Sequence, residues 1–406
     1  MSRSLAILGI GELVTNESGL GRGPLGVIAD AAVVVEDGMI AYVGASRTAP
    51  PADDEIAAAG RCVLPGFVDS HTHLVFAGNR ADEFTARMTG RSYAVGGIAQ
   101  TVETTRSASD AVLLANARRL VEEAVSQGTT TIETKSGYGL TVKDETRSLR
   151  IAAECAEEVT YLGGHVVPEE YERDREAYVD LVAGTMLEEC APLAQWCDVF
   201  CDLGAFDEDE SARILEAALG KGLGLRVHAN QLVPGPGAKL AARFRAASAD
   251  HVNHLSPDDI TALRDGEVVA TLCPGADFST KSRYADGRTL IDAGVTVALA
   301  TDCNPGTSFT TSMPFVVALA VRECGLTPDE AVAAATVGGA KALHREDVGK
   351  VAPGCRGDLV VLDAPSHTYL AYRPGVRLAD LVVRQGEVAF PVDGAVGRRN
   401  EAGNRG

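Results

Sequence analysis

The sequence predicts a (β/α)8 barrel with a small β-sandwich domain built from both chain ends. The chain has 406 residues, enough for two or three domains of about 150 residues each. Between residues 64 and 345, short apolar runs alternate with helical segments, and typical barrels need ~250 residues. Both ends of the chain consist instead of short β-type runs. We therefore expect residues 1–63 and 346–406 to form one composite β-domain and residues 64–345 to form the barrel.

Turn residues mark the β-type runs at both ends. Asp37-Gly38 joins two runs near the N-terminus, which is a strong signal for a hairpin. Gln385-Gly386 joins two runs near the C-terminus in the same way. The tail from Asp393 to Gly406 is rich in Gly, Arg and Asn, and we expect it to be frayed. The expected strands are Ala31–Val35, Met39–Val43, Gly357–Leu362, Ala379–Val383 and Glu387–Phe390.

Eight β-type runs occupy the middle of the chain, with amphipathic segments between them. This alternation is typical of parallel strands joined by helices. A doubly wound sheet is the alternative, but no Gly-x-Gly-x-x-Gly run follows the first strand, so a barrel is favoured. The expected strands are Phe67–Ser70, Thr129–Thr134, Thr160–His165, Asp198–Asp202, Gly224–His228, Ala249–His251, Glu267–Leu272 and Thr296–Thr301. The expected helices include Ala111–Gln127, Thr141–Glu158, Arg173–Cys190, Glu208–Lys221 and Pro257–Arg264.

The chain is strongly acidic. It has 37 Lys and Arg residues against 56 Asp and Glu residues, so its formal net charge is −19. Nucleic acids and anionic membranes both require a basic surface, so we expect neither as a partner. An anionic substrate would have to be bound by individual cations placed close to it.

The sequence shows no sign of export or of membrane insertion. No apolar stretch approaches the roughly 18–20 residues that span a bilayer. Met1–Ile10 is followed at once by Glu12 and lacks a cleavage site, so we interpret it as a first strand. Nine cysteines scattered between Cys62 and Cys355 make no disulfide framework. We therefore expect reduced thiols and a cytoplasmic protein.

Three of the expected strands end in residues that bind metals. His71-Thr72-His73 follows the first strand, His228 ends the fifth, and Asp302 follows the eighth. Residues i and i+2 of a strand point to the same face, so His71 and His73 can grip one ion. The first and eighth strands of a barrel are neighbours, which brings Asp302 beside this pair. Imidazoles with one carboxylate suit Zn²⁺ or Fe rather than Mg²⁺ or Ca²⁺.

Two further histidines, His165 and His251, stand at the ends of expected strands. With a metal at the same mouth of the barrel, either side chain could contact the substrate or the attacking water. The remaining histidines have no such context, and we interpret them as structural or surface residues. They are His254, His344 and His367.

The run Pro65–His73 resembles the opening signature of the amidohydrolase superfamily. Three further runs narrow the resemblance to the imidazolonepropionase family, the ring-opening hydrolases of histidine breakdown. They are His73–Arg80, Lys135–Gly139 and Thr301–Ser308. The likeness covers nearly the whole chain. It depends mainly on the Ser-Gly-Tyr-Gly and Asp-Cys-Asn-Pro-Gly sequences within these runs.

The resemblance implies a metal centre, a substrate and a reaction. One Zn²⁺ or Fe³⁺ per chain would be held by His71, His73, His228 and Asp302. The substrate would be the small anion 4-imidazolone-5-propanoate, whose cyclic amide C–N bond would be hydrolysed to N-formimidoyl-L-glutamate. A homodimer is expected by analogy. The implied substrate-binding residues are Arg80 and Tyr138, on the propionate arm and the ring, with His165, Asn304, Gly306 and Thr307.

Asp302 is the expected catalytic base. It would accept a proton from the attacking water and pass it to the departing ring nitrogen. His251 could donate to the carbonyl oxygen or hold the water. Many members of the superfamily have an acidic residue three positions after the strand-five histidine, where this chain has Gln231. Because an amide cannot take a proton at neutral pH, we expect Gln231 to bind and orient the substrate.

Two other functions are compatible with these residues. One is another single-metal amidohydrolase, either a ring deaminase or an N-acyl amidase, because the four metal ligands do not distinguish it. Arg80 together with Tyr138 favours an anionic ring over a neutral nucleobase. The other is a non-catalytic scaffold, but such proteins usually lose metal ligands and this chain retains all four.

Overall fold

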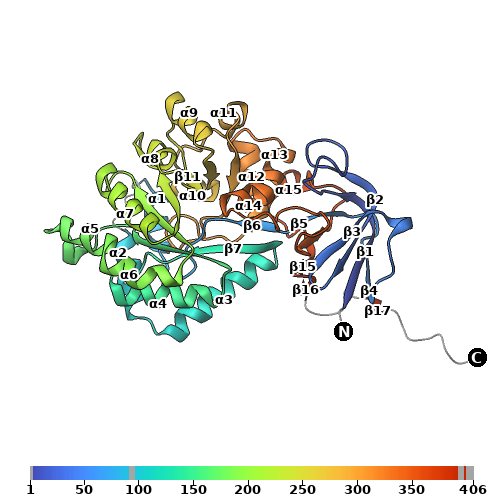
Figure 1. The fold of residues 1–406 in the computed structure, drawn as a ribbon, viewed down its shortest axis with the longest axis horizontal. Coiled ribbons are helices and arrows are strands. Elements are labelled where there is room, and N and C mark those ends of the chain that lie inside the picture. The colour runs from blue at the N-terminus through green and yellow to red at the C-terminus, as the bar shows by residue number, and fades with distance from the viewer. Residues whose placement is uncertain (1–2, 91–96, 392–396, 399–406) are drawn as a thin grey trace, which may run out of the picture.

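The computed structural model describes residues 3–90, 97–391 and 397–398. Two separate sheets organise these residues, one of eight strands and one of nine. Figure 1 shows the eight-stranded sheet within a layer of helices at one end of the molecule and the nine-stranded sheet at the other. The predicted fold class, a barrel with a β-structure made from both chain ends, is confirmed. The domain boundaries after residues 63 and 345 stay a prediction.

All strands of the eight-stranded sheet run parallel, in sequence order. A bridge between Thr72 and Cys303, just beyond the first and last strands, closes the sheet into a barrel. Each of the eight predicted strands is present, with ends shifted by a few residues. The strands are β6 (Phe67–Asp69), β7 (Thr129–Lys135), β8 (Glu158–Gly164), β9 (Trp196–Cys201), β10 (Gly224–Ala229), β11 (Ser248–His251), β12 (Val269–Leu272) and β13 (Val297–Leu299).

The predicted helix Arg173–Cys190 is two helices, because Gly184 leaves the helical conformation with φ −109° and ψ −113°. The predicted helix Thr141–Glu158 ends earlier, and Glu158 begins β8 instead. The helices are α1 (Ala81–Met88), α2 (Ile98–Ser107), α3 (Asp110–Val125), α4 (Val142–Ala153), α5 (Arg175–Ala183), α6 (Thr185–Cys190), α7 (Glu208–Gly220), α8 (Gly237–Arg243), α9 (Pro257–Asp265), α10 (Pro274–Thr280), α11 (Gly287–Asp292), α12 (Met313–Glu323), α13 (Pro328–Ala333), α14 (Gly339–Ala342) and α15 (Tyr369–Tyr372). Shorter turns are η1 (Ser46–Thr48), η3 (Glu169–Tyr171), η4 (Ala191–Leu193) and the π-helical η5 (Ala334–Gly338).

Side-chain caps fix where several barrel helices begin. Asp207 and Glu210 form a reciprocal capping box at the start of α7, and Ser256 with Asp259 does the same for α9. Each box satisfies backbone N–H groups that the first turn of a helix leaves without a partner. The loops before α7 and α9 follow β9 and β11, so the caps fix where these loops end.

The nine-stranded sheet joins the two chain ends where β5 pairs with β14. Strand β1 pairs with β2 on one side and with β4 and β5 on the other. The predicted sandwich is instead one continuous hydrogen-bonded sheet that curls round its own core. Met39, at the start of β3, forms a bridge with Arg356, just before β14. Strands from both ends contribute to this core. The nine strands of the sheet are β1 (Ser4–Leu13), β2 (Ile28–Glu36), β3 (Met39–Ala45), β4 (Asp54–Ala57), β5 (Cys62–Pro65), β14 (Leu359–Leu362), β15 (Ala379–Arg384), β16 (Glu387–Phe390) and β17 (Gly397–Arg398).

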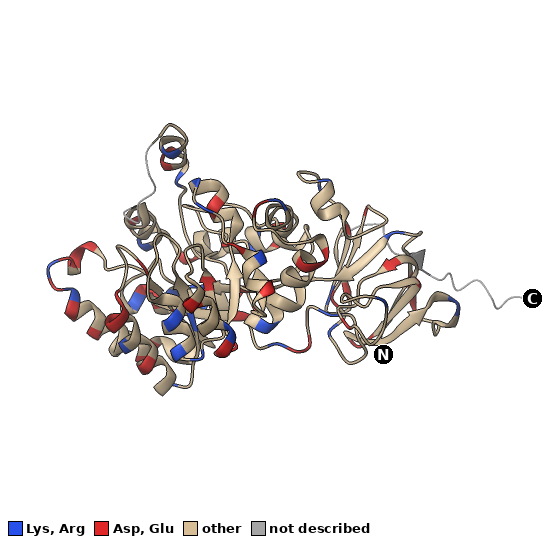
Figure 2. Ribbon diagram, turned by 90° about the horizontal axis from the view of Figure 1, so that it is seen from above, with Lys and Arg blue, Asp and Glu red and all other residues tan. Residues whose placement is uncertain are grey.

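Apart from β17, which pairs with β4, the predicted frayed tail Asp393–Gly406 lies outside the described residues. Acidic and basic residues are mixed over the barrel helices (Figure 2). All nine cysteines are free thiols. Each helix in the described ranges is too short or too polar to cross a lipid bilayer.

His367 connects the nine-stranded sheet to helix α13. Its Nδ1 lies 2.7 Å from Oε1 of Glu12 in β1, and its Nε2 lies 2.8 Å from Oδ1 of Asp329 in α13. Burial disfavours the charged imidazole, but the hydrogen bonds to the two carboxylates outweigh burial and raise the pKa of His367. Burial also opposes ionisation of Glu12, yet the bonds from His367 lower the pKa of this carboxyl to about 2. His367 was predicted to be a structural or surface residue, and it forms an ionic bridge between Glu12 and Asp329.

We expect His367→Gln to reduce the free energy of unfolding by about 1–2 kcal/mol, because a charge-assisted bridge is lost. A raised pKa means that the folded protein keeps a proton that the unfolded chain releases. The bridge therefore contributes fully below the unfolded pKa of about 6.5 and is lost as the pH rises through the folded value. Chemical denaturation of both proteins between pH 5.5 and pH 9 measures this difference. A difference that does not shrink with rising pH, or an equal loss in the control His344→Gln, would contradict the bridge.

Candidate active site

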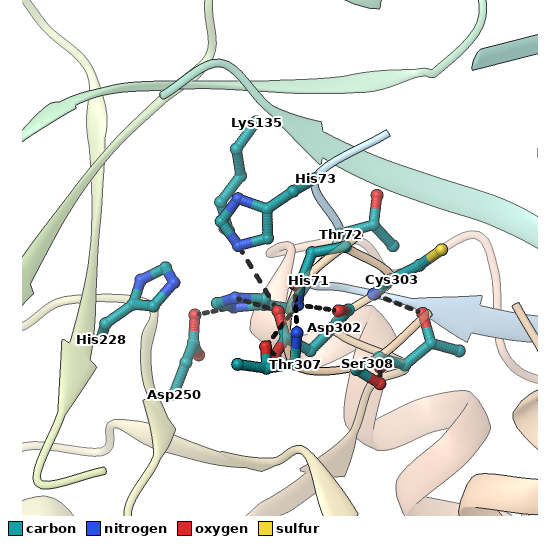
Figure 3. A network of polar contacts seen from close by, with 12 residues as sticks. His71, Thr72, His73, Lys135, His228, Asp250, Asp302, Cys303, Thr307 and Ser308 are labelled. Atoms are coloured by element: carbon teal, nitrogen blue, oxygen red, sulfur yellow. Dashed lines mark hydrogen bonds and ion pairs between the residues drawn. The ribbon is translucent and has the colours of Figure 1, made fainter. Parts of the chain in front are cut away.

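The polar residues at the C-terminal mouth of the barrel lie together because of how the barrel closes. The backbone N–H of Asp302 donates to the carbonyl of His71 at 3.0 Å, and that of His73 donates to the carbonyl of Cys303 at 2.9 Å. These bonds place the segment after β6 alongside the segment after β13. Figure 3 shows His71, His73 and Asp302 converging there, with His228 and Asp250 approaching from neighbouring strands. The predicted neighbourhood of His71, His73 and Asp302 is present.

Among the described residues, three groups of converging side chains could hold a metal ion, and His71 belongs to each of them, in one case with Asp198 and Asp250. His71, His73 and Asp302 offer ligand atoms within 4.8 Å of one another, and so do His71, His228 and His251. Oδ1 of Asp302 lies 3.5 Å from Nε2 of His73 and 3.7 Å from Nε2 of His71. Nε2 of His71 is buried and has no hydrogen-bond partner among the described residues. A buried imidazole nitrogen of this kind is costly unless it has a ligand, so the residues fit a metal cofactor.

Two aspartates behind the histidines orient the rings. Oδ2 of Asp250 lies 2.6 Å from Nδ1 of His71, and Oδ2 of Asp198 lies 3.0 Å from Nδ1 of His228. A carboxylate on one ring nitrogen fixes the tautomer and turns the other nitrogen toward the metal. Neither aspartate was predicted from the sequence as a site residue, although an aspartate inside an apolar strand is a sequence signal for a functional site.

Two buried cations keep these aspartates ionised. Lys135 Nζ lies 2.9 Å from Glu133 Oε1 and 3.0 Å from Asp198 Oδ2, while Arg226 lies 3.6 Å from Asp250. Burial opposes ionisation of both aspartates. His228 and Lys135 outweigh it at Asp198, and Arg226 and Lys135 outweigh it at Asp250, so both pKa values are lowered. Charged carboxylates are therefore available to hold the two imidazoles at neutral pH.

Burial keeps four histidines of the mouth neutral at neutral pH. Burial lowers the pKa of His71 and His73 well below the usual value, and it lowers those of His165 and His251 to about 3. A neutral imidazole has the lone pair that metal binding requires. Burial has the opposite effect on Asp302 and raises its pKa to about 7. A cation beside this carboxyl would favour its ionised form.

One wall of a pocket of about 340 Å³, part of which is open to solvent, is formed by His73, His228, His251 and Asp302. Nearly all the residues predicted to bind substrate line the same pocket. His165 is held there by its Nδ1, 2.8 Å from the carbonyl of Gly137. The sequence analysis did not identify Ile98 or Phe200, which also line the pocket. The predicted residues in the lining are Arg80, Tyr138, His165, Gln231, His251, Asn304 and Thr307.

Asn304 organises the turn that leaves β13. Its amide nitrogen donates to the carbonyl of Asp302 and to Oγ1 of Thr307, each at 2.7 Å. Its amide oxygen accepts from the backbone N–H groups of Gly306 and Thr307, each at 2.8 Å. The turn holds Asp302 at φ +49°, a left-handed conformation that costs a non-glycine residue about 1–2 kcal/mol. Asn304 therefore fixes the position of Asp302 as well as lining the pocket.

Gly306 lies against the Arg80 guanidinium, and its contact with the substrate stays a prediction. It is absent from the residues that line the pocket. A Cβ at this position would come closer than 3.0 Å to Nη1 of Arg80, a distance that Cβ atoms essentially never show. Gly306 thus acts through Arg80, by leaving room for its guanidinium.

Comparison with known proteins agrees with this geometry. Residues 62–389 match the model of the amidohydrolase family. The chain is 61% identical to the imidazolonepropionase of Mycolicibacterium smegmatis over 387 residues, which cover 95% of this chain and 98% of that protein. It is 59% identical to the imidazolonepropionase of Streptomyces griseus, over 94% of this chain and 98% of that protein.

Solved structures of lower identity share the fold. The 5-methylcytosine deaminase of Klebsiella pneumoniae has a TM-score of 0.75 at 17% identity, with 94% of this chain and 97% of that chain covered. Atrazine chlorohydrolase TrzN of Arthrobacter aurescens, solved in complex with zinc, has a TM-score of 0.70 at 18% identity, with 95% and 94% covered. From the barrel, its converging histidines and these relatives, we conclude that the chain belongs to the amidohydrolase family and, within it, to the imidazolonepropionases.

Proposed function

We propose that this chain hydrolyses the cyclic amide C–N bond of 4-imidazolone-5-propanoate, giving N-formimidoyl-L-glutamate in histidine degradation. One observation carries the proposal. A pocket at the barrel mouth joins the metal-binding histidines to Arg80 and Tyr138, in a chain 61% identical to a protein named imidazolonepropionase. The metal-binding residues at one end of the pocket favour a hydrolytic reaction. Arg80 favours a substrate that has a carboxylate.

In this proposal one Zn²⁺ or Fe³⁺ is held by His71, His73, His228 and Asp302. His251 shares a ligand group with His71 and His228, so its side chain would lie beside an ion bound by these histidines. When bound, such an ion lowers the pKa of a water molecule from 15.7 to roughly 7 and polarises a carbonyl group. The choice between zinc and iron is left to direct metal analysis, because both accept this donor set.

Asp302 moves the proton in the proposed reaction. Its carboxylate takes a proton from the attacking water and delivers it to the ring nitrogen as the C–N bond breaks. The hydroxyl of Thr307, 3.4 Å from Oδ2 of Asp302, helps to hold the carboxylate. His251 donates a hydrogen bond to the carbonyl oxygen of the substrate or to the water, as its neutral ring allows.

Gln231 binds the substrate in this scheme. Oδ2 of Asp202 accepts the backbone N–H groups of Gln231 at 2.6 Å and of Leu232 at 2.9 Å, which fixes the turn after β10. The side chain of Gln231 lines the pocket with His251. An amide offers both a donor and an acceptor to the ring but cannot carry the proton. Proton transfer is therefore assigned to Asp302 alone.

The other end of the pocket receives the propionate arm. Arg80 pairs with the carboxylate of the substrate, Tyr138 and His165 contact the ring, and Asn304 with Thr307 borders the ring beside the metal. Gly306 acts through Arg80, as described above. We further propose that the protein works as a cytoplasmic homodimer.

Turnover of the proposed substrate by the metal-loaded protein tests the function directly. We expect freshly prepared 4-imidazolone-5-propanoate to lose its ring absorbance, and mass spectrometry to identify N-formimidoyl-L-glutamate. Treatment with a chelator should abolish the reaction, and Zn²⁺ or iron should restore it. If protein with stoichiometric metal leaves the substrate intact, the proposed function is wrong, and a ring deaminase or an N-acyl amidase takes its place.

The substitution Asp302→Asn should lower kcat by about 10²–10⁴-fold, because the group that accepts the proton is gone. The three histidines should retain part of the metal, which elemental analysis measures. Asp277→Asn is the matched control. Asp277 is buried outside the pocket lining, and burial raises its pKa to about 8, so that it is already largely neutral at pH 7. Wild-type kcat in metal-loaded Asp302→Asn protein would place the proton acceptor elsewhere.

The substitution Arg80→Lys should raise KM by about tenfold or more while the metal content stays constant. A lysine retains the charge but cannot form two parallel hydrogen bonds with a carboxylate. Steady-state kinetics and elemental analysis of the purified variant measure both quantities. An unchanged KM would remove Arg80 from the carboxylate-binding role.

A further inference from the structure

Arg80 belongs to a cluster of three charged side chains beside the pocket. Oε2 and Oε1 of Glu83 lie 2.5 Å and 2.8 Å from Nε and Nη2 of Arg80. Oε1 of Glu83 also accepts from Nη1 of Arg87 at 2.8 Å. The side chains of both arginines are only 2% exposed, whereas that of Glu83 is 25% exposed. Of the three residues, only Arg80 lines the pocket.

Two glycines form a slot around the ion pair. A Cβ at Gly97 would come closer than 3.0 Å to Nη2 of Arg80 and to Oε2 of Glu83. A Cβ at Gly306 would crowd Nη1 of Arg80 in the same way. In this conformation, the guanidinium and its carboxylate partner lie against Gly97, and the guanidinium also lies against Gly306. This slot fixes the plane of the guanidinium before any substrate arrives.

Arg87 ties the cluster to the same glycine. Its Nη2 donates to the carbonyl of Gly306 at 2.6 Å, while its Nη1 holds Glu83. Arg87 thus links the start of α1, which carries Arg80, to the turn after β13, which carries Asn304. Moving Arg87 would loosen both sides of the slot at once.

The charges of the cluster decide what it can bind. The three side chains of Arg80, Glu83 and Arg87 together have a formal charge of +1. A guanidinium has two edges with paired donors, so pairing of the Nε–Nη2 edge with Glu83 is compatible with a carboxylate at the Nη1–Nη2 edge. The cluster without Arg87 would be neutral, and its attraction for an anion would be weak in a protein of net charge −19.

We propose that Arg87 is a specificity-determining residue. Through its contacts with Glu83 and Gly306, Arg87 offsets the negative charge of Glu83 and holds Arg80 in position to bind one substrate carboxylate. This inference rests on the proposed role of Arg80. Arg87 is a positioning residue in this scheme, because it reaches the substrate only through its neighbours. It makes the pocket select a singly charged propanoate arm over a neutral arm of the same shape.

Binding of two ligands to the metal-loaded enzyme tests the proposal. Imidazole-4-propanoate and its neutral amide, imidazole-4-propanamide, differ only in the charge of the arm. We expect Arg87→Met to weaken binding of the propanoate at least tenfold by calorimetry and to change binding of the amide less than twofold. KM for 4-imidazolone-5-propanoate should rise by a similar factor while kcat changes less than threefold. Arg87→Lys should restore part of the propanoate affinity.

Gly97→Ala provides a second variant that alters no charge. The added methyl group should displace the Arg80–Glu83 pair and weaken propanoate binding without changing metal content. The matched charge control is Arg118→Met, which removes an exposed arginine of α3 and should leave both affinities unchanged. Metal content and melting temperature show whether each variant is folded.

Three outcomes would overturn the proposal. Equal weakening of the propanoate and the amide by Arg87→Met would give Arg87 a merely structural role. An unchanged propanoate affinity in folded Arg87→Met and Gly97→Ala proteins, with a raised KM in Arg80→Lys, would overturn this inference and leave the function of Arg80 intact. An unchanged KM in Arg80→Lys would overturn the carboxylate role of Arg80 and the inference with it.

Discussion

The backbone pairing that closes the barrel is the constraint on which the active site depends. His71 and Cys303 accept the N–H groups of Asp302 and His73, and Asp69 binds both the N–H and the hydroxyl of Thr301. These bonds set the register between the segments that follow the first and last strands. Histidines and an aspartate that are over two hundred residues apart in sequence are thereby brought within reach of one ion. A shift of this register by one residue would turn the side chains away from the mouth.

The closed barrel then has to accommodate charge in its interior. Glu133, Asp198 and Asp250 are fully buried, and Lys135 and Arg226 compensate two of the three negative charges. Buried ion pairs are costly to desolvate and are retained only where they satisfy one another closely. Here they hold the imidazoles of His71 and His228 from behind. The remaining excess of negative charge, to which Asp302 adds, suits a site that binds a cation.

The two ends of the pocket have opposite electrostatic character. The metal-binding end is lined by histidines and a carboxyl group, whereas the other end has the cluster of Arg80, Glu83 and Arg87 with a formal charge of +1. A substrate with a neutral ring and an anionic arm has a single favourable orientation in such a pocket. The glycines at positions 97 and 306 sharpen that orientation, because they confine the guanidinium to one plane.

The sequence by itself determined the strand order, the eight barrel strands, the origin of the second sheet from both chain ends, and the residues at the barrel mouth. These features depend on local periodicity and on short motifs, which a linear chain displays directly. Only the tertiary structure revealed Asp198, Asp250, Lys135 and Arg226 behind the histidines, Glu83 and Arg87 beside Arg80, and the role of Gly306 as space for a guanidinium. The role of a buried charge or of a glycine depends on its neighbours in space. Those neighbours come from distant strands and loops, whose register is set by barrel closure and not by any local pattern.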